Sequence, residues 1–295
     1  MSDEQGLASP ATIRHTVGAN GTFGLNNVSG DIRIRGEETD EIVVMARWEN
    51  GDKDKPLPLV VRRGEGSLHI DTDDRSGWIS FRHHGSIEFE VTVPRNARVD
   101  ISSVSSDIES HHIYGDQTYK TVSGDLLVDG TSGRVSATTV SGDLQLTAID
   151  ALEANLTTTS GDVEAFAKTF APVRVRTVSG DVDLRGGFAS GPQHTVETVS
   201  GDLSIDAMSG LSVDTKRGLD FSKQNKGPIV SGDGSANLRF RSLSGDVRLS
   251  GFSAAQPPQP QANREDSMEI LRALERGEID VDEASRRLEG APNRG

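Results

Sequence analysis

The sequence predicts an all-β protein: a parallel β-solenoid (β-helix) with irregular N-terminal capping strands and a small C-terminal α-hairpin. Three observations lead to this expectation. A Ser-Gly-Asp triplet recurs through the chain, most copies follow one another after 18 to 21 residues, and alternating apolar residues flank each copy. Repeats of this length are typical of solenoid coils, which bury a core only by stacking. The composition agrees, because 4% of the residues are aromatic and 32 are glycine.

The aspartates of the triplets define the register of the repeat. They are Asp31, Asp125, Asp143, Asp162, Asp181, Asp202, Asp233 and Asp246, and the near copy Ser105-Ser106-Asp107 extends the series. From Asp107 to Asp202 the successive spacings are 18, 18, 19, 19 and 21 residues. We interpret the following residues as a structural ladder along the solenoid: Asp107, Asp125, Asp143, Asp162, Asp181, Asp202 and Asp246.

Apolar alternation predicts a strand on each side of every aspartate. The residues eight, six and four positions before it fit an inward face, and so do those one and three positions after it, such as Leu144 and Leu146. Val122, Val140 and Val178 stand three positions before an aspartate. We expect them to turn inward at a corner, where the alternation changes parity.

The corner also fixes the roles of the triplet residues. The glycine is expected on the inward side, where a side chain would crowd the neighbouring backbone. Serine and aspartate are expected to point outward. Equivalent residues of stacked coils would then form ladders with a spacing of about 4.8 Å.

The series is interrupted after Asp202. Asp246 follows 44 residues later, about two coils, and Asp233 lies only 13 residues before Asp246, too close to form a rung of its own. Residues 211–219 fit the strand template without an aspartate. We therefore expect the missing coil there, followed by an excursion over about 222–234.

The N-terminal third is less regular. Asp31 is flanked by strand patterns on both sides, which predicts one rung. Apolar segments with irregular spacing follow it, at 42–45, 59–61, 68–70, 78–81 and 87–93. These are expected to be strands that cover the open end of the solenoid, because an uncovered end would present unpaired backbone groups.

Composition changes divide the chain into segments. We expect a disordered N-terminus over 1–10, the solenoid over 11–250 with regular coils from about 99, a Pro/Gln linker over 251–263, a helical hairpin over 264–290 and a tail over 291–295. The hairpin is too short to bury much core alone, so its apolar residues are candidates for partner binding. They are Met268, Leu271, Leu274, Ile279 and Leu288.

Val-Ser-Gly-Asp occurs in Asn27–Ile34 and recurs within Ser105–Leu249, and Ile87–Pro94 is an alternating apolar segment between them. On these residues the chain resembles the bacterial putative-adhesin β-strand repeat family, a domain of unknown function, over about 11–250. The hairpin resembles the SHOCT-like helical modules attached to some bacterial envelope-stress proteins. The resemblance implies a protein linked to the cell envelope or its stress response, and the adhesin label implies surface adhesion.

Charge and composition exclude several classes of protein. The net charge of −14 argues against nucleic-acid binding, which rests on Lys and Arg neutralising phosphates. The absence of cysteine excludes disulfides and Cys-ligated metals. No secretory signal and no apolar stretch of membrane-spanning length is present. We therefore expect a cytoplasmic protein without membrane insertion, with export to the cell surface by a non-standard route as the alternative.

The aspartate ladder has two interpretations. Neighbouring carboxylates about 4.8 Å apart repel by roughly 0.9 kcal/mol per pair even in water, so something must offset the repulsion. We favour main-chain N–H groups of the turns as the compensating donors, helped by Ser hydroxyls and by flanking Arg or Lys side chains. The alternative is a row of divalent-cation sites, although calcium requires six to eight oxygen ligands. We expect no cofactor and no metal.

Two further groups of polar residues are weak ligand candidates. His83-His84 and His111-His112 are adjacent pairs, and adjacent strand residues face opposite sides, so neither pair can chelate a metal. Asp71, Asp73 and Asp74 form an acidic cluster near Trp78 and Phe81. We interpret this cluster as a solvated loop, with a ligand site as the less favoured alternative.

These observations favour a non-enzymatic scaffold or binding protein. A protein partner or an envelope polymer would bind its outer sheets, and the hairpin would mediate assembly, with a homo-oligomer as one form of it. A surface adhesin is the alternative. A polysaccharide-acting enzyme is less favoured, because a glycosidase needs two carboxyls in different environments, whereas the ladder aspartates are equivalent.

Overall fold

The computed structural model describes residues 3–49, 55–72, 85–217 and 228–251. These ranges form strands and contain no helix, so the described part is all-β, as the sequence predicts. None of it is a helix that could span a membrane. The chain divides into two units, Met1–Phe252 and Ser253–Gly295. The hairpin over 264–290, the tail and all of the predicted linker except Gly251 lie outside the described residues, together with the five candidates from Met268 to Leu288.

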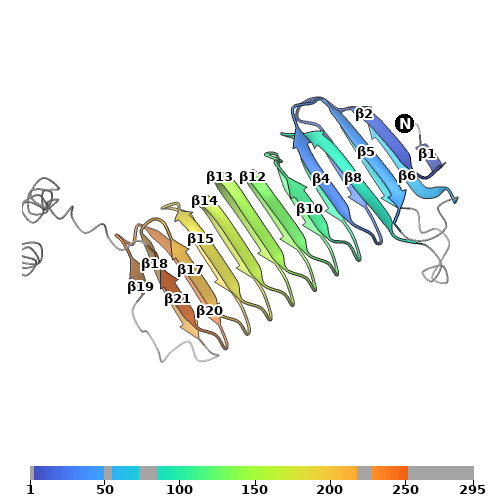
Figure 1. Cartoon of the computed structure of the whole chain (residues 1–295). Coiled ribbons are helices and arrows are strands. Elements are labelled where there is room, and N and C mark those ends of the chain that lie inside the picture. The colour runs from blue at the N-terminus through green and yellow to red at the C-terminus, as the bar shows by residue number, and fades with distance from the viewer. Residues whose placement is uncertain (1–2, 50–54, 73–84, 218–227, 252–295) are drawn as a thin grey trace, which may run out of the picture. The chain divides into compact units, whose positions relative to one another are not determined.

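The strands of the first unit form two faces that run along the row of coils (Figure 1). Face A has the order β2 (Ala11–Thr16), β5 (Glu41–Trp48), β8 (Ile87–Pro94), β4 (Ile32–Glu37), β10 (Ile108–His111), the first halves of β12 (Leu126–Thr138), β13 (Leu144–Thr157) and β14 (Val163–Arg176), then β15 (Val182–Phe188), β17 (Leu203–Ala207) and β21 (Val247–Ser250).

Face B has the order β1 (Asp3–Leu7), β6 (Leu57–Gly64), β7 (Ser67–Thr72), β3 (Thr22–Asn26), β9 (Arg98–Ser102), β11 (Gln117–Lys120), the second halves of β12, β13 and β14, then β16 (Gln193–Glu197), β20 (Ala236–Ser242), β18 (Leu211–Arg217) and β19 (Ile229–Ser231). Three strands, β12 to β14, bend from one face into the other. The core therefore lies between two faces of the same coils.

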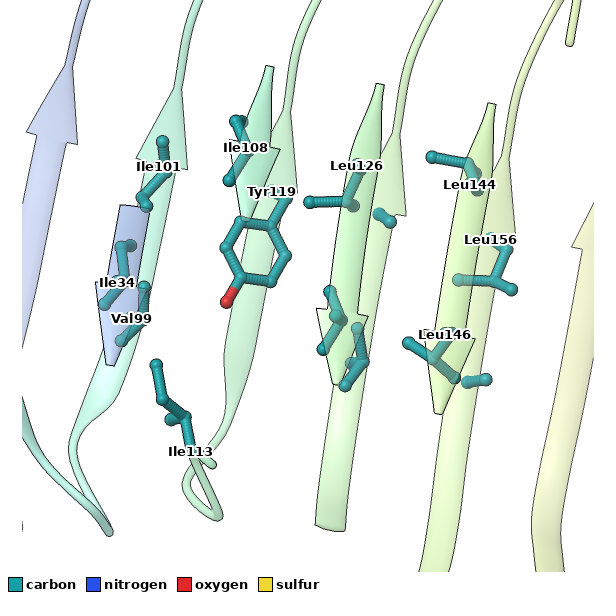
Figure 2. Packing of buried hydrophobic residues seen from close by; sticks show 14 of the residues in the cluster. Ile34, Val99, Ile101, Ile108, Ile113, Tyr119, Leu126, Leu144, Leu146 and Leu156 are labelled. Carbon is teal, nitrogen blue, oxygen red and sulfur yellow. The ribbon is translucent and has the colours of Figure 1, made fainter. Parts of the chain in front are cut away.

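Successive regular coils pair in parallel and in register. Leu126 pairs with Leu144, which pairs with Val163 of the next coil. These side chains are buried, and Figure 2 shows Leu126 and Leu144 on neighbouring strands. The residues at the predicted inward positions thus stack into apolar rows, because a fixed coil length repeats the same alternation at the same height.

The N-terminal strands extend both faces beyond the coil of Asp31. On face A, β2, β5 and β8 pair antiparallel before β8 joins β4 in parallel. On face B, β1, β6 and β7 do the same before β7 joins β3. The strands predicted at 42–45, 59–61, 68–70 and 87–93 are present, and 78–81 lies outside the described residues. The expectation of a disordered segment over 1–10 is wrong for the described residues 3–10, because β1 pairs with β6 and Ala11 begins β2.

The order of the last strands differs from the prediction. The coil of Asp246 stacks directly on the coil of Asp202, since β20 pairs with β16 and β21 with β17. No coil is missing between them. Residues 211–217 form β18 on the far side of β20, and β19 pairs antiparallel with β18. The predicted excursion over 222–234 therefore includes a strand at the end of face B. The alternation of apolar residues could not predict this strand order, because a strand can pair with any free edge that has matching alternation.

Candidate binding edge

The corners of the coils line up as one continuous edge of the first unit, which we call the Ser-Gly-Asp edge. It consists of the triplets and the residue before each of them. Isolated parallel bridges connect the serines from coil to coil, in the order Ser29, Ser105, Ser123, Ser141, Ser160, Ser179, Ser200 and Ser244. This order places all coils, including the last, in one register.

The main chain of the edge is paired between coils. The Ser123 N–H donates to the Val104 carbonyl at 2.9 Å, and the Gly124 N–H donates to the Ser141 carbonyl at 3.1 Å. The same two bonds recur at the following coils. The corner is therefore as regularly bonded as a strand, which makes it a rigid surface.

The aspartates form the predicted ladder through their side chains. Asp107 Oδ1 accepts the N–H of Asp125 at 2.9 Å, and each later aspartate repeats the contact. The equivalent N–H donors are Asp143, Asp162, Asp181, Asp202 and Asp246, at 2.8 to 2.9 Å from the preceding carboxylate. The compensating donors are main-chain N–H groups, as the favoured interpretation predicts, and each comes from the next aspartate of the row.

The glycines of the edge are required by close packing of neighbouring corners. Gly161 has φ +145°, and a Cβ on it would overlap the carbonyl oxygen of Gly142. Gly142 and Gly180 meet the same carbonyl group of the coil before them. This agrees with the prediction that a side chain here would crowd the adjacent backbone.

The apolar residue before the triplet points outward, so the predicted inward turn is wrong. The exposed fraction of these side chains is 44 to 49%. They are Val104, Val122, Val140, Val178, Val199 and Leu243, which we call the Val row. The strand alternation continues without a break to this position. The change of parity falls on the glycine instead, because its positive φ redirects the chain.

The histidine pair at 111 and 112 does not converge on a site. His111 Nδ1 lies 3.7 Å from an Asp129 carboxylate oxygen, and the two imidazole centroids are 6.4 Å apart. His83-His84 lies outside the described residues. Across the described ranges, no group of three or more His, Asp or Glu side chains is placed to hold a metal ion.

Asp71 belongs to a polar cluster on the outside of face B. Its carboxylate accepts hydrogen bonds from Asn26 Nδ2 at 2.6 Å and from Arg62, and it lies 3.1 Å from His69 Nε2. Burial raises the pKa of Asp71, but the Asn26 hydrogen bond and the charges of His69 and Arg62 outweigh it, so the net pKa is lowered. Asp73, Asp74, Trp78 and Phe81 lie outside the described residues.

Sequence reasoning missed the partners of Asp71 and the exposure of the Val row. Asn26, Arg62 and His69 come from three strands that meet only when β6 and β7 are placed beside β3. The recurrence of Val at one position was visible, but alternation alone did not distinguish an outward row from an inward corner.

The chain belongs to the Toastrack family, because the family model Toastrack DUF4097 matches residues 22–217. The parallel coils of the first unit are thus the structure of a Toastrack protein. No curated protein matches the chain.

Several solved structures are similar in outline. A "putative adhesin" from Bacteroides fragilis is 11% identical, with 84% of this chain and 100% of that chain covered and a TM-score of 0.48. A "putative adhesin" from Parabacteroides distasonis is 13% identical, with coverage of 84% and 96% and a TM-score of 0.36. A "putative lipid binding protein" from the same species is 12% identical, with coverage of 84% and 98% and a TM-score of 0.32. Identities this low carry no information on ligand or partner.

Proposed function

We propose that this protein is a non-enzymatic scaffold, a parallel β-helix that binds a macromolecular partner along its Ser-Gly-Asp edge. In this proposal it serves the bacterial cell envelope or its stress response, and the C-terminal hairpin over 264–290 mediates assembly or partner binding. The observation that carries the proposal is the edge itself. Apolar, hydroxyl and carboxylate side chains stand there in straight rows on a main chain that is bonded from coil to coil.

Rigidity supports a binding role for the edge. Each corner donates and accepts main-chain hydrogen bonds with both neighbouring coils. A surface that is already ordered loses little conformational entropy when a partner binds. The edge can therefore present many weak contacts at fixed spacing.

The environments of the carboxylates support the non-enzymatic part of the proposal. A glycosidase requires one carboxyl that stays protonated and one that is ionised, in different surroundings. The ladder aspartates share one geometry, with Oδ1 occupied by an N–H group. A groove of about 350 Å³ on face A is lined by Glu37, Glu90 and Glu109. Glu90 pairs with Arg47 at 3.4 Å and Glu109 with Arg33 at 3.5 Å, which favours the ionised form of these two carboxyls.

Photo-crosslinking of the full-length protein in cells tests this proposal. A photoreactive amino acid replaces Val122 or Val140 on the edge, or Ile149 or Met208 as exposed apolar controls elsewhere. We expect one discrete macromolecular adduct from the edge positions and none from the controls. Adducts from the controls alone, or none from any position, would contradict the proposal.

The hairpin is tested in the same assay. Leu271→Ser with Leu274→Ser should weaken the edge adduct or the assembly of the protein, whereas Arg272→Ser should not. An unchanged adduct and an unchanged oligomeric state would remove the hairpin from the proposal. Protease added to intact cells distinguishes the alternative of a surface adhesin, which would be digested, from a scaffold with an internal partner.

A further inference from the structure

We propose that the Ser-Gly-Asp edge receives a basic amphipathic α-helix of another protein. The helix would lie along the edge, with its apolar stripe on the Val row and its Lys and Arg side chains toward the aspartate ladder. This inference rests on the proposed function and specifies the chemical class of the partner.

The Val row is an apolar surface of unusual regularity. Twelve large apolar side chains are exposed within the described ranges, and six of them form this row. Thr159 takes the equivalent position between Val140 and Val178. Exposed apolar residues scattered singly need no explanation, whereas a continuous patch marks an interaction site. The row therefore requires a partner with a matching apolar stripe.

The carboxylates beside the row define the charge of that partner. From Asp107 to Asp181, Oδ1 accepts a main-chain N–H, and no group in the described structure bonds the second oxygen. These five oxygens stand in line on a protein of net charge −14. A cationic partner is attracted to such a row. A second copy of the chain, a nucleic acid or an anionic membrane would instead bring like charges together.

The main-chain bonding of the edge favours a helix over an added strand. β-Augmentation requires free N–H and C=O groups on the receiving surface. Here the Ser and Gly N–H groups of the corner already donate to neighbouring coils. A helix satisfies its own backbone and offers only side chains, so it can use this edge.

The spacing of the rows also fits a helix. Coils repeat about every 4.8 Å, which is close to the rise of about 5.4 Å per turn along one face of an α-helix. Alternate residues of an extended strand are separated by about 6.7 Å, which falls out of step with the coils. The seven coils from Val104 to Leu243 span about 29 Å, the length of a helix of about 19 residues.

A synthetic peptide tests the inference on the full-length protein. The probe is a 20-residue peptide of Leu, Lys, Ala and Gln that has a Leu stripe and a Lys row on one flank. Three controls accompany it: the same residues in scrambled order, the same helix with Glu in place of Lys, and an alternating Val-Lys peptide. We measure affinity by calorimetry and peptide helicity by circular dichroism. The amphipathic basic peptide should bind at least about tenfold more tightly than each control and become helical on binding.

Two pairs of variants place the peptide on the edge. Val122→Ser with Val140→Ser should weaken binding by about tenfold, while Ile149→Ser with Met208→Ser should leave it within about twofold. Asp143→Asn with Asp162→Asn keeps the Oδ1 acceptors but removes two charges. It should weaken binding at low salt and have less effect at high salt.

The outcomes separate this inference from the proposed function. Equal binding of the scrambled or Val-Lys peptide, or binding that ignores the edge variants, would overturn the helix assignment. If the peptide fails in this way while crosslinks in cells still map to Val122 and Val140, the edge binds a partner of another class. If crosslinking also fails at the edge, the proposed function falls as well.

Discussion

The N-terminal strands and the regular coils differ in how each strand edge is paired with its neighbour. The coils repeat one unit, so each aspartate accepts the N–H of the next, as Asp143 does for Asp162. The N-terminal strands reverse direction instead, as in the antiparallel pairing of β5 with β8 and of β6 with β7. The coils therefore extend both faces by parallel pairing, whereas the strands at the N-terminal end pair antiparallel.

The two regions also differ in how their outer polar groups are satisfied. On the N-terminal strands, the Glu88 carboxylate forms ion pairs with the guanidinium groups of Arg33 at 2.6 Å and Arg47 at 2.8 Å. Here side chains pair with side chains. Along the coils the repeated polar contact joins a side chain to the main chain. A repeated acceptor makes stability depend on the backbone register, whereas an ion pair depends on the identity of both side chains.

Gly161→Ala should break a regular coil and have the largest effect on stability. The new Cβ would overlap the Gly142 carbonyl and force neighbouring coils apart. We expect a loss of more than about 3 kcal/mol in the free energy of urea unfolding. Gly18→Ala in the N-terminal region is the control, since Gly18 has φ +77° but nothing within 4 Å of the added Cβ. It should cost only about 1–2 kcal/mol. Similar losses for both variants would contradict the close-packing argument.

Tyr119→Phe probes the junction between the two regions. The buried hydroxyl lies 2.7 Å from Ser110 Oγ and 2.8 Å from Gln117 Oε1, so its removal leaves buried polar atoms with fewer partners. We expect a loss of about 1–3 kcal/mol in thermal or urea unfolding. Tyr114→Phe should change stability by less than about 0.5 kcal/mol, because its ring is partly exposed and stacks near Arg95. An equal effect would show that the polar cluster contributes nothing specific.

Asp162→Ala tests whether the ladder acts through its acceptor oxygens. It removes the Oδ1 that accepts the Asp181 N–H at 2.8 Å, and we expect a loss of about 1–2 kcal/mol in unfolding experiments. Asp162→Asn retains an oxygen and removes a repelling charge, so it should be neutral or slightly stabilising.

Asp31 gives the contrast from the N-terminal side. Its carboxylate pairs with Arg33 at 3.2 Å on an exposed surface. Asp31→Ala should therefore cost less than about 1 kcal/mol. If Asp162→Asn destabilised the protein as much as Asp162→Ala, the charge rather than the acceptor would hold the ladder.

His194 gives the regular coils a pH dependence of stability. Burial lowers the pKa of His194 from its ordinary value of 6.5, and its Nδ1 accepts the Val173 N–H while Nε2 lies 3.0 Å from the Ala189 carbonyl. The unfolded chain takes up a proton below about pH 6.5 that the folded state excludes. Stability should therefore fall as the pH is lowered from 6.5 toward the folded pKa. His194→Gln should reduce the dependence of the melting temperature on pH over this range. An unchanged dependence would contradict the assignment to His194.

Much of this architecture was predictable from the sequence. The coil length, the inward rows and the need for glycine at the corner follow from local properties, namely alternation and the room available beside a backbone. The rung of Asp31 and the strands at 42–45, 59–61, 68–70 and 87–93 were predictable for the same reason. The aspartate ladder could be predicted from the regular spacing. The residue whose main-chain N–H donates to each carboxylate could not.

Features that depend on which strands become neighbours could be seen only in the folded molecule. A chain of nearly identical coils follows from local sequence, because each repeat encodes its own strands and corner. It did not determine that β20 would insert between β16 and β18, since parallel strands with the same alternation can exchange places without changing their local pattern. Nor did it determine that the Val row would face outward. The side chains face outward because the alternation changes parity at the glycine and not before it. The close approach of neighbouring coils fixes the conformation of that glycine.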